Sequence, residues 1–385
     1  MELVIKNARV YHNHRFEDRE VLIQNGTIAQ VAPRVDAPAG CQVLDLGGKR
    51  LVPGFIDVHT HGGAGVDVNA ATADQLNNTI GKFFASQGTT GWLASVLTDT
   101  PEQTLWCIDQ AKAAMKAPIT GAQLMGIHLE GPFLSVEYKG AMPEHLLQKG
   151  NAELFRKYQQ AADGAVRYIT VSPEVEGVVD MIAEIAGHTT VAIGHSGADY
   201  ETSCAAIDAG AACCTHTFNA MGLFHQHRPG IMGAVLERPV CCEAICDGRH
   251  LHPGSVRMLL ACKGWDKVVA VTDSIQAAGL PDGHYKLGVN DVVVEDGDAK
   301  LASNGVRAGS TLTTGQALRN LVKFTGESVE KVLPLLTANP ARLIGMDHRK
   351  GSIAPGKDAD LVVLDQDLNV TATYVAGECV FAGEN

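Results

Sequence analysis

The sequence predicts an α/β fold, in which a (β/α)8 TIM-type barrel carries a small β-sandwich built from both ends of the chain. Two observations predict it. In the middle of the 385-residue chain, short apolar segments alternate with stretches of helical period. At both ends, strand-like segments follow one another without such stretches between them. We therefore expect residues 1–50 and 350–385 to form the β-sandwich and residues 51–349 to form the barrel.

The terminal segments have the composition of strands and turns. Strand-like runs cover residues 3–7, 21–26, 27–31 and 43–48, and the last part of the chain adds 359–364 and 371–378. Asn25-Gly26 separates two of these runs, and this dipeptide is a strong signal for a tight hairpin. The two ends are therefore expected to assemble into one β-rich unit.

The middle of the chain holds eight candidate strands. They end near His59, Leu97, Glu130, Ser172, His195, His216, Asp247 and Asp273. Helical stretches follow at 72–86, 101–116, 144–162, 175–187, 199–209 and 253–263, with further helices at 314–325 and 328–338. A doubly wound open sheet would show the same alternation, but it would not gather polar residues from strands so far apart in order. In a closed barrel the active site lies at the C-terminal ends of the strands.

Composition excludes several classes of function. The net charge of -12, with acidic and basic residues mixed along the chain, argues against a nucleic-acid partner and still allows a small anionic substrate. No apolar run is long enough for a membrane span, and the N-terminus lacks a signal peptide, so we expect a cytoplasmic protein. The ten cysteines, including Cys213-Cys214 and Cys241-Cys242, lack CxxC spacing and are expected to be mostly buried free thiols.

The first predicted barrel strand ends in two histidines, His59 and His61. Residues two apart on a strand point to the same face, so both imidazoles leave the strand tip in one direction. Neutral imidazole is the commonest metal ligand in proteins. The pair predicts a metal site at the mouth of the barrel, although two unrelated surface histidines would give the same pattern.

Other strand ends strengthen the metal interpretation. Strand three presents His128 and Glu130, strands five and six end in His195 and His216, and strand eight ends in Asp273. Singly, each has an ordinary explanation, since a buried histidine can cap a loop and an aspartate can cap a helix. Imidazoles together with a carboxylate suit Zn²⁺, Fe²⁺, Co²⁺ or Mn²⁺. We expect His128 to hydrogen-bond this site rather than to ligate.

The motifs around these residues resemble a known family. They read Pro-Gly-Phe-Ile-Asp-Val-His-Thr-His-Gly-Gly, Gly-Ile-His-Leu-Glu-Gly-Pro-Phe, Gly-His-Ser, Thr-His-Thr-Phe-Asn-Ala-Met, Asp-Gly-Arg-His, Val-Thr-Asp, Gly-Ser-Thr-Leu-Thr, Asn-Pro-Ala-Arg and Ala-Pro-Gly-Lys-Asp-Ala-Asp-Leu. In this order they resemble the amidohydrolase superfamily and, more narrowly, the family of N-acetylglucosamine-6-phosphate deacetylases. The resemblance covers essentially the whole chain.

The resemblance implies a metal-dependent deacetylation. It implies that Glu130, His195 and His216 bind one divalent ion, and the retained His59 and His61 favour a second ion with Glu130 as the bridge. Asp273 would take the proton of the nucleophile and pass it to the departing amine. The expected products are acetate and glucosamine 6-phosphate, with one or two zinc, iron, cobalt or manganese ions per subunit.

Substrate contacts carry over less completely. The resemblance implies that Asn219, Ala220 and His250 contact the sugar phosphate, and that an arginine two residues before a Pro-Gly pair does so from the partner subunit of a homodimer. At that position this chain has His227, with Arg228 one residue later. Arginine offers a two-pronged donor that histidine lacks. Either Arg228 reaches the phosphate, or anion binding is altered, or the loop is merely a solvated basic segment.

A second departure follows Lys-Gly-Ala, where relatives carry a histidine that polarises the substrate carbonyl. This chain has Met142 there, and we expect the nearby His145 to be an ordinary residue near a helix start. These departures keep three alternatives open. The substrate could be the galactosamine epimer or another acetylamino sugar. It could be a cyclic amide, although no lysine stands at a strand end to bridge metals. The chain could also be a barrel protein without catalysis.

Overall fold

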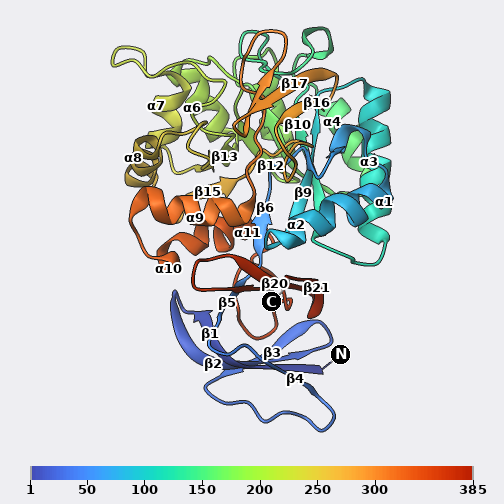
Figure 1. Cartoon of the computed structure of the whole chain (residues 1–385). Coiled ribbons are helices and arrows are strands. Elements are labelled where there is room, and N and C mark those ends of the chain that lie inside the picture. Colours follow the sequence, from blue (N-terminus) through green and yellow to red (C-terminus); the bar gives the residue numbers. More distant parts are fainter. Residues whose placement is uncertain (1, 384–385) are drawn as a thin grey trace.

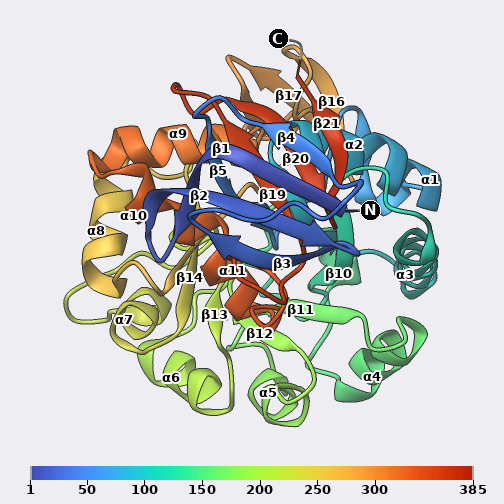
Figure 2. The same cartoon turned by 90° about the horizontal axis from the view of Figure 1, so that it is seen from below.

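The computed structural model describes residues 2–383. A barrel of parallel strands with helices on its outside lies above a separate sheet made from the two ends of the chain (Figure 1). Viewed from the side of that sheet, the helices surround the strands as a ring (Figure 2). Within the described residues no helix combines the length and apolar character needed to cross a bilayer.

Eight parallel strands form the barrel, as the sequence predicts. In spatial order they are β15 (Val268–Val271), β14 (Cys241–Ile245), β13 (Cys213–Cys214), β12 (Thr190–Ile193), β11 (Val166–Val171), β10 (Gln123–Glu130), β9 (Thr89–Leu97) and β6 (Phe55–Asp57). Just beyond the ends of the two outermost strands, the Asp273 amide donates to His59 O at 2.9 Å and the His61 amide donates to Ser274 O at 2.7 Å. These bonds bring the two edges together, so the sheet is a barrel and not an open doubly wound sheet.

The outer helices follow the strands. They are α1 (Ala73–Gln75), continued by a π-helical stretch (Leu76–Gly81) and α2 (Lys82–Ser86), α3 (Pro101–Lys116), α4 (Ala152–Ala161), α5 (Val178–Ile185), α6 (Tyr200–Asp208), α7 (Gly230–Glu237), α8 (Pro253–Lys263), α9 (Thr314–Thr325), α10 (Val329–Val332) and α11 (Ala338–Leu343). Short 3-10 turns cover Val68–Ala70, Glu144–Leu146 and Leu333–Leu336. Helix α3 shows why local sequence predicted these elements, because Thr100 caps the Gln103 amide and proline occupies the first turn.

Two helix predictions were wrong in their extent. In the predicted helix 144–162 only the second half is α-helical, because Gly150 lies against Gly177 so closely that a Cβ would come within 2.4 Å of its carbonyl carbon. The chain then restarts as α4 with Asn151 as its cap. The predicted helix 328–338 is divided into short pieces, since Pro334 has no amide hydrogen and Thr337 leaves helical geometry at φ -130° and ψ -80°.

Two elements were not predicted from the sequence. One is α7, and the other is a small antiparallel sheet of β16 (Gly283–Leu287), β17 (Asn290–Glu295) and β18 (Asp298–Leu301). A two-stranded piece, β7 (Gly62–Gly63) with β8 (Val66–Asp67), follows the first barrel strand. The β16–β18 sheet stands at the C-terminal end of the barrel (Figure 1). It therefore lies on the side where the site residues collect.

The second sheet joins the two ends of the chain. Its order is β21 (Glu378–Ala382), β20 (Val370–Val375), β19 (Leu361–Leu364), β5 (Arg50–Pro53), β1 (Glu2–His12), β2 (Arg15–Gln24) and β3 (Thr27–Ala32), with β4 (Gln42–Asp45) also paired to β1. The predicted hairpin at Asn25-Gly26 is confirmed, and both residues have the positive φ of a tight turn, 51° and 77°. Apolar residues from both ends share one core in this unit. We propose that 1–50 with 350–385 is a domain separate from 51–349.

A buried ion pair lies where the chain returns to the terminal sheet. The Lys350 side chain is 2% exposed and its ammonium contacts Asp360 and, at 3.1 Å, Asp358. The Asp360 carboxylate also accepts the Ala376 amide at 2.9 Å. Removing the cation would leave two buried carboxylates without compensation.

Replacing Lys350 by methionine is therefore expected to lower the free energy of unfolding by about 3–5 kcal/mol. Urea denaturation of the purified protein measures this change. Lys286→Met is the matched control, because the Lys286 side chain is 62% exposed and its pair with Asp291 contributes under about 1 kcal/mol. Equal destabilisation by the two variants would contradict the role given to the buried pair.

Candidate metal centre and active site

The two histidines after β6 point toward one another, as their spacing predicts. His59 and His61 are 0% and 2% exposed, and their Nε2 atoms lie 3.3 Å apart. Backbone contacts fix this segment: Thr60 donates its amide to the Ser95 hydroxyl at 2.9 Å, and Ser95 O lies 3.0 Å from His61 Nδ1. The second contact places the His61 proton on Nδ1 and leaves Nε2 free to ligate.

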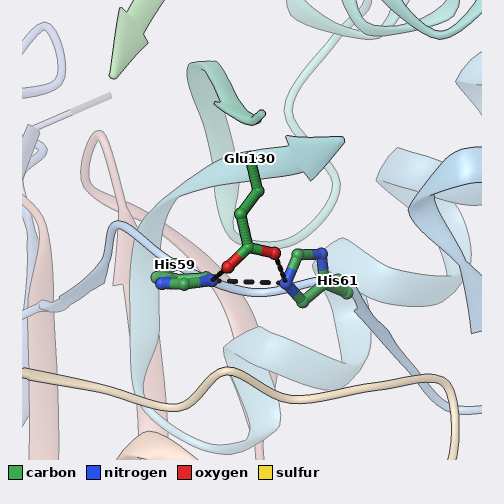
Figure 3. Close-up of side chains that lie close together, drawn as sticks. All are labelled: His59, His61 and Glu130. Atoms are coloured by element: carbon green, nitrogen blue, oxygen red, sulfur yellow. Dashed lines mark hydrogen bonds and ion pairs between the residues drawn. The ribbon is translucent and has the colours of Figure 1, made fainter. Parts of the chain in front are cut away.

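Glu130 ends strand β10 and faces both of these imidazoles (Figure 3). Its Oε2 lies 3.2 Å from His61 Nε2 and its Oε1 lies 3.4 Å from His59 Nε2. The same Oε1 lies 3.1 Å from His195 Nε2 and 3.4 Å from His216 Nε2. One buried carboxylate thus contacts two separate pairs of imidazoles.

The second pair comes from the ends of β12 and β13. His195 and His216 have φ of 48° and 26°, a left-handed backbone that residues other than glycine rarely adopt. Such strain persists where the surrounding structure enforces it, most often at functional sites. The two Nε2 atoms lie 2.9 Å apart, and His195 Nδ1 is 2.8 Å from the Tyr138 carbonyl. The strained turns aim both rings at Glu130.

Asp273 follows β15 and closes the cluster on the side of the first pair. It is 7% exposed, and its Oδ1 lies 3.3 Å from His61 Nε2 and 3.6 Å from His59 Nε2. Its φ of 50° is also left-handed. Asp273 therefore stands beside the imidazoles rather than capping a helix.

The electrostatics of the cluster favour positive charge at its centre. Burial disfavours ionisation of Glu130, but attraction to His59 and hydrogen bonds with His195 and His216 outweigh it and hold its pKa well below the ordinary value. Burial likewise opposes a charged His61, but hydrogen bonds to Asp273 and Glu130 outweigh it and raise its pKa to about 9. The pKa of Asp273 is also lowered, because attraction to His59 and the hydrogen bond with His61 outweigh burial. The carboxylates are ionised, and they attract cations.

These residues fit a divalent metal ion. Two groups have ligand atoms within 4.8 Å of one another, namely His59-His61-Glu130 and Glu130-His195-His216. A tetrahedral ion about 2.1 Å from each ligand places the ligand atoms about 3.4 Å apart, and the contacts given above run from 2.9 to 3.4 Å. Four imidazole nitrogens and a shared carboxylate are also the donor set that borderline-soft ions prefer. The two groups share Glu130.

His128 lies directly behind the first pair. Its Nδ1 is 2.8 Å from the Ser95 hydroxyl and its Nε2 is 2.9 Å from the Thr170 hydroxyl, so both ring nitrogens are already hydrogen-bonded. Its ring meets His59 edge to face with centroids 4.6 Å apart. This placement agrees with the expectation that His128 supports the site without ligating.

A cavity of about 320 Å³ opens onto the cluster. Four of the residues expected to contact substrate line it: Met142, Asn219, Ala220 and His250. His250 is held in place by Asp247, whose Oδ2 is 2.7 Å from its Nδ1. The β16–β18 region contributes further lining that the sequence did not indicate, from Leu287 and from the segment 306–309.

Three residues of the substrate analysis lie elsewhere. His227 and Arg228 are exposed in the loop between β13 and α7, and neither lines this cavity within the described residues. The same loop exposes Leu223 by 90% and Phe224 by 59%. His145 sits in a 3-10 turn at the surface, as an ordinary residue would.

Sequence reasoning missed Glu243 and Asp57. Both are buried, Glu243 at 0% and Asp57 at 2% exposure, and both contact the His59 segment. Asp57 accepts from the Thr272 hydroxyl at 2.6 Å, which ties β6 to β15. Their signal in the sequence is an acidic residue inside an otherwise apolar strand, which a buried site must compensate.

Comparisons with known proteins agree with this geometry. The model of the amidohydrolase family matches residues 50–380. The chain is similar to N-acetylglucosamine-6-phosphate deacetylase from Bacillus subtilis (strain 168), with 36% identity covering 98% of this chain and 97% of that one. It is also similar to N-acetylgalactosamine-6-phosphate deacetylase from Escherichia coli O157:H7, with 33% identity covering 94% of each.

Two solved structures show the same fold. The crystal structure of N-acetylglucosamine-6-phosphate deacetylase from Pasteurella multocida superposes with a TM-score of 0.93 at 30% identity, covering 100% of both chains. A mutant of the Mycobacterium smegmatis enzyme, solved in complex with N-acetyl-D-glucosamine-6-phosphate, gives a TM-score of 0.90 at 33% identity, covering 98% of this chain and 99% of that one.

Proposed function

This chain belongs to the amidohydrolase family, and on that premise we propose that it removes the acetyl group from N-acetylglucosamine 6-phosphate. The products are glucosamine 6-phosphate and acetate. One observation carries the proposal: Glu130 lies between two imidazole pairs, with Asp273 beside them, at the inner end of a single cavity. Amide hydrolysis needs an activated water and a proton carrier, and this arrangement offers both.

We propose two divalent ions per chain, drawn from zinc, iron, cobalt and manganese. His59, His61 and Glu130 would hold one, and Glu130, His195 and His216 would hold the other. When bound, such ions act as Lewis acids that lower the pKa of a coordinated water toward neutrality and polarise a carbonyl. Met142 has only a weak acceptor sulfur and donates no hydrogen bond, so it leaves that polarisation to other groups.

Asp273 is the proton carrier in this proposal. It is ionised before the reaction, because its pKa is lowered by His59 and His61 against the effect of burial. It takes a proton from the water that attacks the acetamide carbon. It then passes this proton to the amide nitrogen as the C–N bond breaks, so that the sugar leaves as a neutral amine and acetate remains.

For the sugar phosphate we propose Asn219, Ala220 and His250, which line the same cavity. We propose that the exposed loop carrying His227 and Arg228 completes the site across a homodimer, so that one protomer's loop approaches the cavity of the other. The exposed Leu223 and Phe224 on this loop support an interface there. A phosphorylated sugar is a metabolite held inside the cell, so we propose a cytoplasmic enzyme.

Comparing four substrates tests the function. We expect kcat/KM to be highest for N-acetylglucosamine 6-phosphate and to fall at least about 10²-fold for the free sugar, since two hydrogen bonds to a charged phosphate are lost. A coupled acetate assay measures this with the phosphorylated and free forms of N-acetylglucosamine and N-acetylgalactosamine.

Each other result has a defined meaning. Preference for the galactosamine phosphate would favour the second candidate, which the similarity to the Escherichia coli enzyme supports. Preference for free sugars would overturn the phosphate assignment. Release of acetate from none of the four would contradict deacetylation of these sugars.

Removing metal tests the cofactor. Dialysis against a strong chelator is expected to abolish activity and to lower stability by about 4 kcal/mol relative to protein with metal at a thousand times its dissociation constant. Adding back Zn²⁺ or Co²⁺ should restore both. Mock-dialysed protein is the control. Full activity in protein whose metal content is shown to be negligible would refute a metal-dependent reaction.

A further inference from the structure

A buried carboxylate outside the two ligand groups contacts both of them. Glu243 lies in the middle of β14 and is 0% exposed. Its Oε2 lies 2.9 Å from His59 Nδ1 and accepts the His216 amide at 2.8 Å. Its backbone carbonyl accepts the Thr217 amide at 3.0 Å. A single residue thus holds one imidazole of the first pair and the strained backbone of the second.

The contact to His59 decides which ring nitrogen carries the proton. A carboxylate oxygen only accepts, so His59 Nδ1 must be protonated and Nε2 must present its lone pair. That lone pair faces His61 Nε2 at 3.3 Å and Glu130 Oε1 at 3.4 Å. A carboxylate behind a ligating histidine also raises the basicity of the nitrogen that binds the metal.

The other imidazoles are supported differently. The Nδ1 atoms of His61 and His195 face the neutral carbonyls of Ser95 and Tyr138. His216 Nδ1 has no hydrogen-bond partner among the described residues. Of these four rings, the one backed by a carboxylate is His59, on the first group. Changing the charge of Glu243 should therefore affect that group more than the other.

Charge at the site points the same way. Glu130, Glu243 and Asp273 are 3%, 0% and 7% exposed, and Glu243 Oε1 has no hydrogen-bond partner among the described residues. Buried anions require nearby positive charge. Three ionised carboxylates exceed the charge of one divalent ion, so a second ion at His59 and His61 accounts for the acidic residue behind them.

We propose that Glu243 is a positioning residue, which fixes the tautomer and orientation of His59 and so sets the affinity of the His59-His61-Glu130 group for its divalent ion. The proposal rests on the proposed function for the identity of the site as a two-ion centre. It goes beyond that function by assigning to one group a determinant that the other does not share.

Metal titration of the Glu243→Gln variant tests this. Glutamine keeps the size of the side chain and removes its charge. Starting from apoprotein, wild type should take up two Co²⁺ per chain, followed by their visible absorption. In the variant, the affinity of the first group should fall 10- to 100-fold, while the ion of the Glu130-His195-His216 group stays bound within about threefold. Excess Co²⁺ should restore both occupancy and turnover, which a purely structural lesion would not allow.

Two further variants make the result decisive. Glu243→Asp retains the charge at shorter reach and should lie between wild type and Glu243→Gln in affinity. Glu201→Gln, on the exposed surface of α6, should titrate like wild type.

Equal affinities in Glu243→Gln and wild type would overturn the proposal. So would loss of both ions without recovery at excess Co²⁺, or failure of both Glu243 variants to fold. A wild-type protein that binds two ions but deacetylates none of the four sugars would refute the proposed function and leave the role of Glu243 standing.

Discussion

Replacing Asp273 by asparagine is expected to lower kcat by about 10²- to 10⁴-fold, the usual contribution of a general base and acid. Asparagine has the same shape but cannot accept the proton of the attacking water. The backbone bonds that hold this segment, from the Asp273 amide to His59 O and from the Ser310 amide to Asp273 O, do not involve the side chain. The barrel should therefore stay closed, and KM and metal content should remain within about threefold.

Steady-state acetate release, with metal content measured on the same sample, checks this expectation. Asp291→Asn serves as the control, because the Asp291 side chain is 73% exposed and pairs with Lys286 on the surface. The control should keep kcat within about twofold. A kcat near that of wild type in Asp273→Asn would remove Asp273 from the role of proton carrier. A low kcat accompanied by loss of metal would mean that its carboxylate acts as a ligand instead.

Sequence patterns predicted the barrel well because its information is local. Each barrel strand is a short apolar run followed by a polar residue, and His59, Glu130, His195, His216 and Asp273 all follow such runs directly. Parallel strands of a barrel bring their C-terminal ends to one side. Residues 214 positions apart, from His59 to Asp273, could thus be placed at one site without knowledge of any contact between them.

Other features could not be found in this way because they depend on tertiary contacts. The end of the predicted helix at 144–162 was wrong because Gly150 meets Gly177, a contact between two segments that no local periodicity records. The β16–β18 sheet was missed because its strands are short and partly exposed, and nothing in their composition says that they stand over the cavity.

Glu243 shows the same limit at the site itself. It belongs to no motif, and its partner His59 lies 184 residues away. A glutamate between Cys242 and Ala244 signals only that a buried charge needs compensation. Which group provides it becomes visible when strand β14 is placed across the barrel from the segment that follows β6.

Replacing Glu130 by glutamine is expected to have an effect on the whole centre, because both ligand groups share this carboxylate. Glutamine loses the negative charge, and its amide hydrogens would face imidazole nitrogens that also need to bind an ion. We expect metal content to fall from two ions to at most one per chain, and kcat to fall by at least about 10²- to 10³-fold, as when one preorganised electrostatic contact is removed. Metal analysis after gel filtration and single-turnover acetate release measure the two effects.

A glutamate in the same cavity provides the comparison. Glu137 also lines the cavity, but it belongs to neither ligand group, so Glu137→Gln should retain both ions. The two variants remove the same charge from the same cavity and differ in contact with the imidazoles. If Glu130→Gln kept two ions and wild-type turnover, the shared carboxylate would not be a ligand, and the two imidazole pairs would have to act independently. If both variants lost metal equally, the general negative potential of the cavity, rather than ligation by Glu130, would hold the ions.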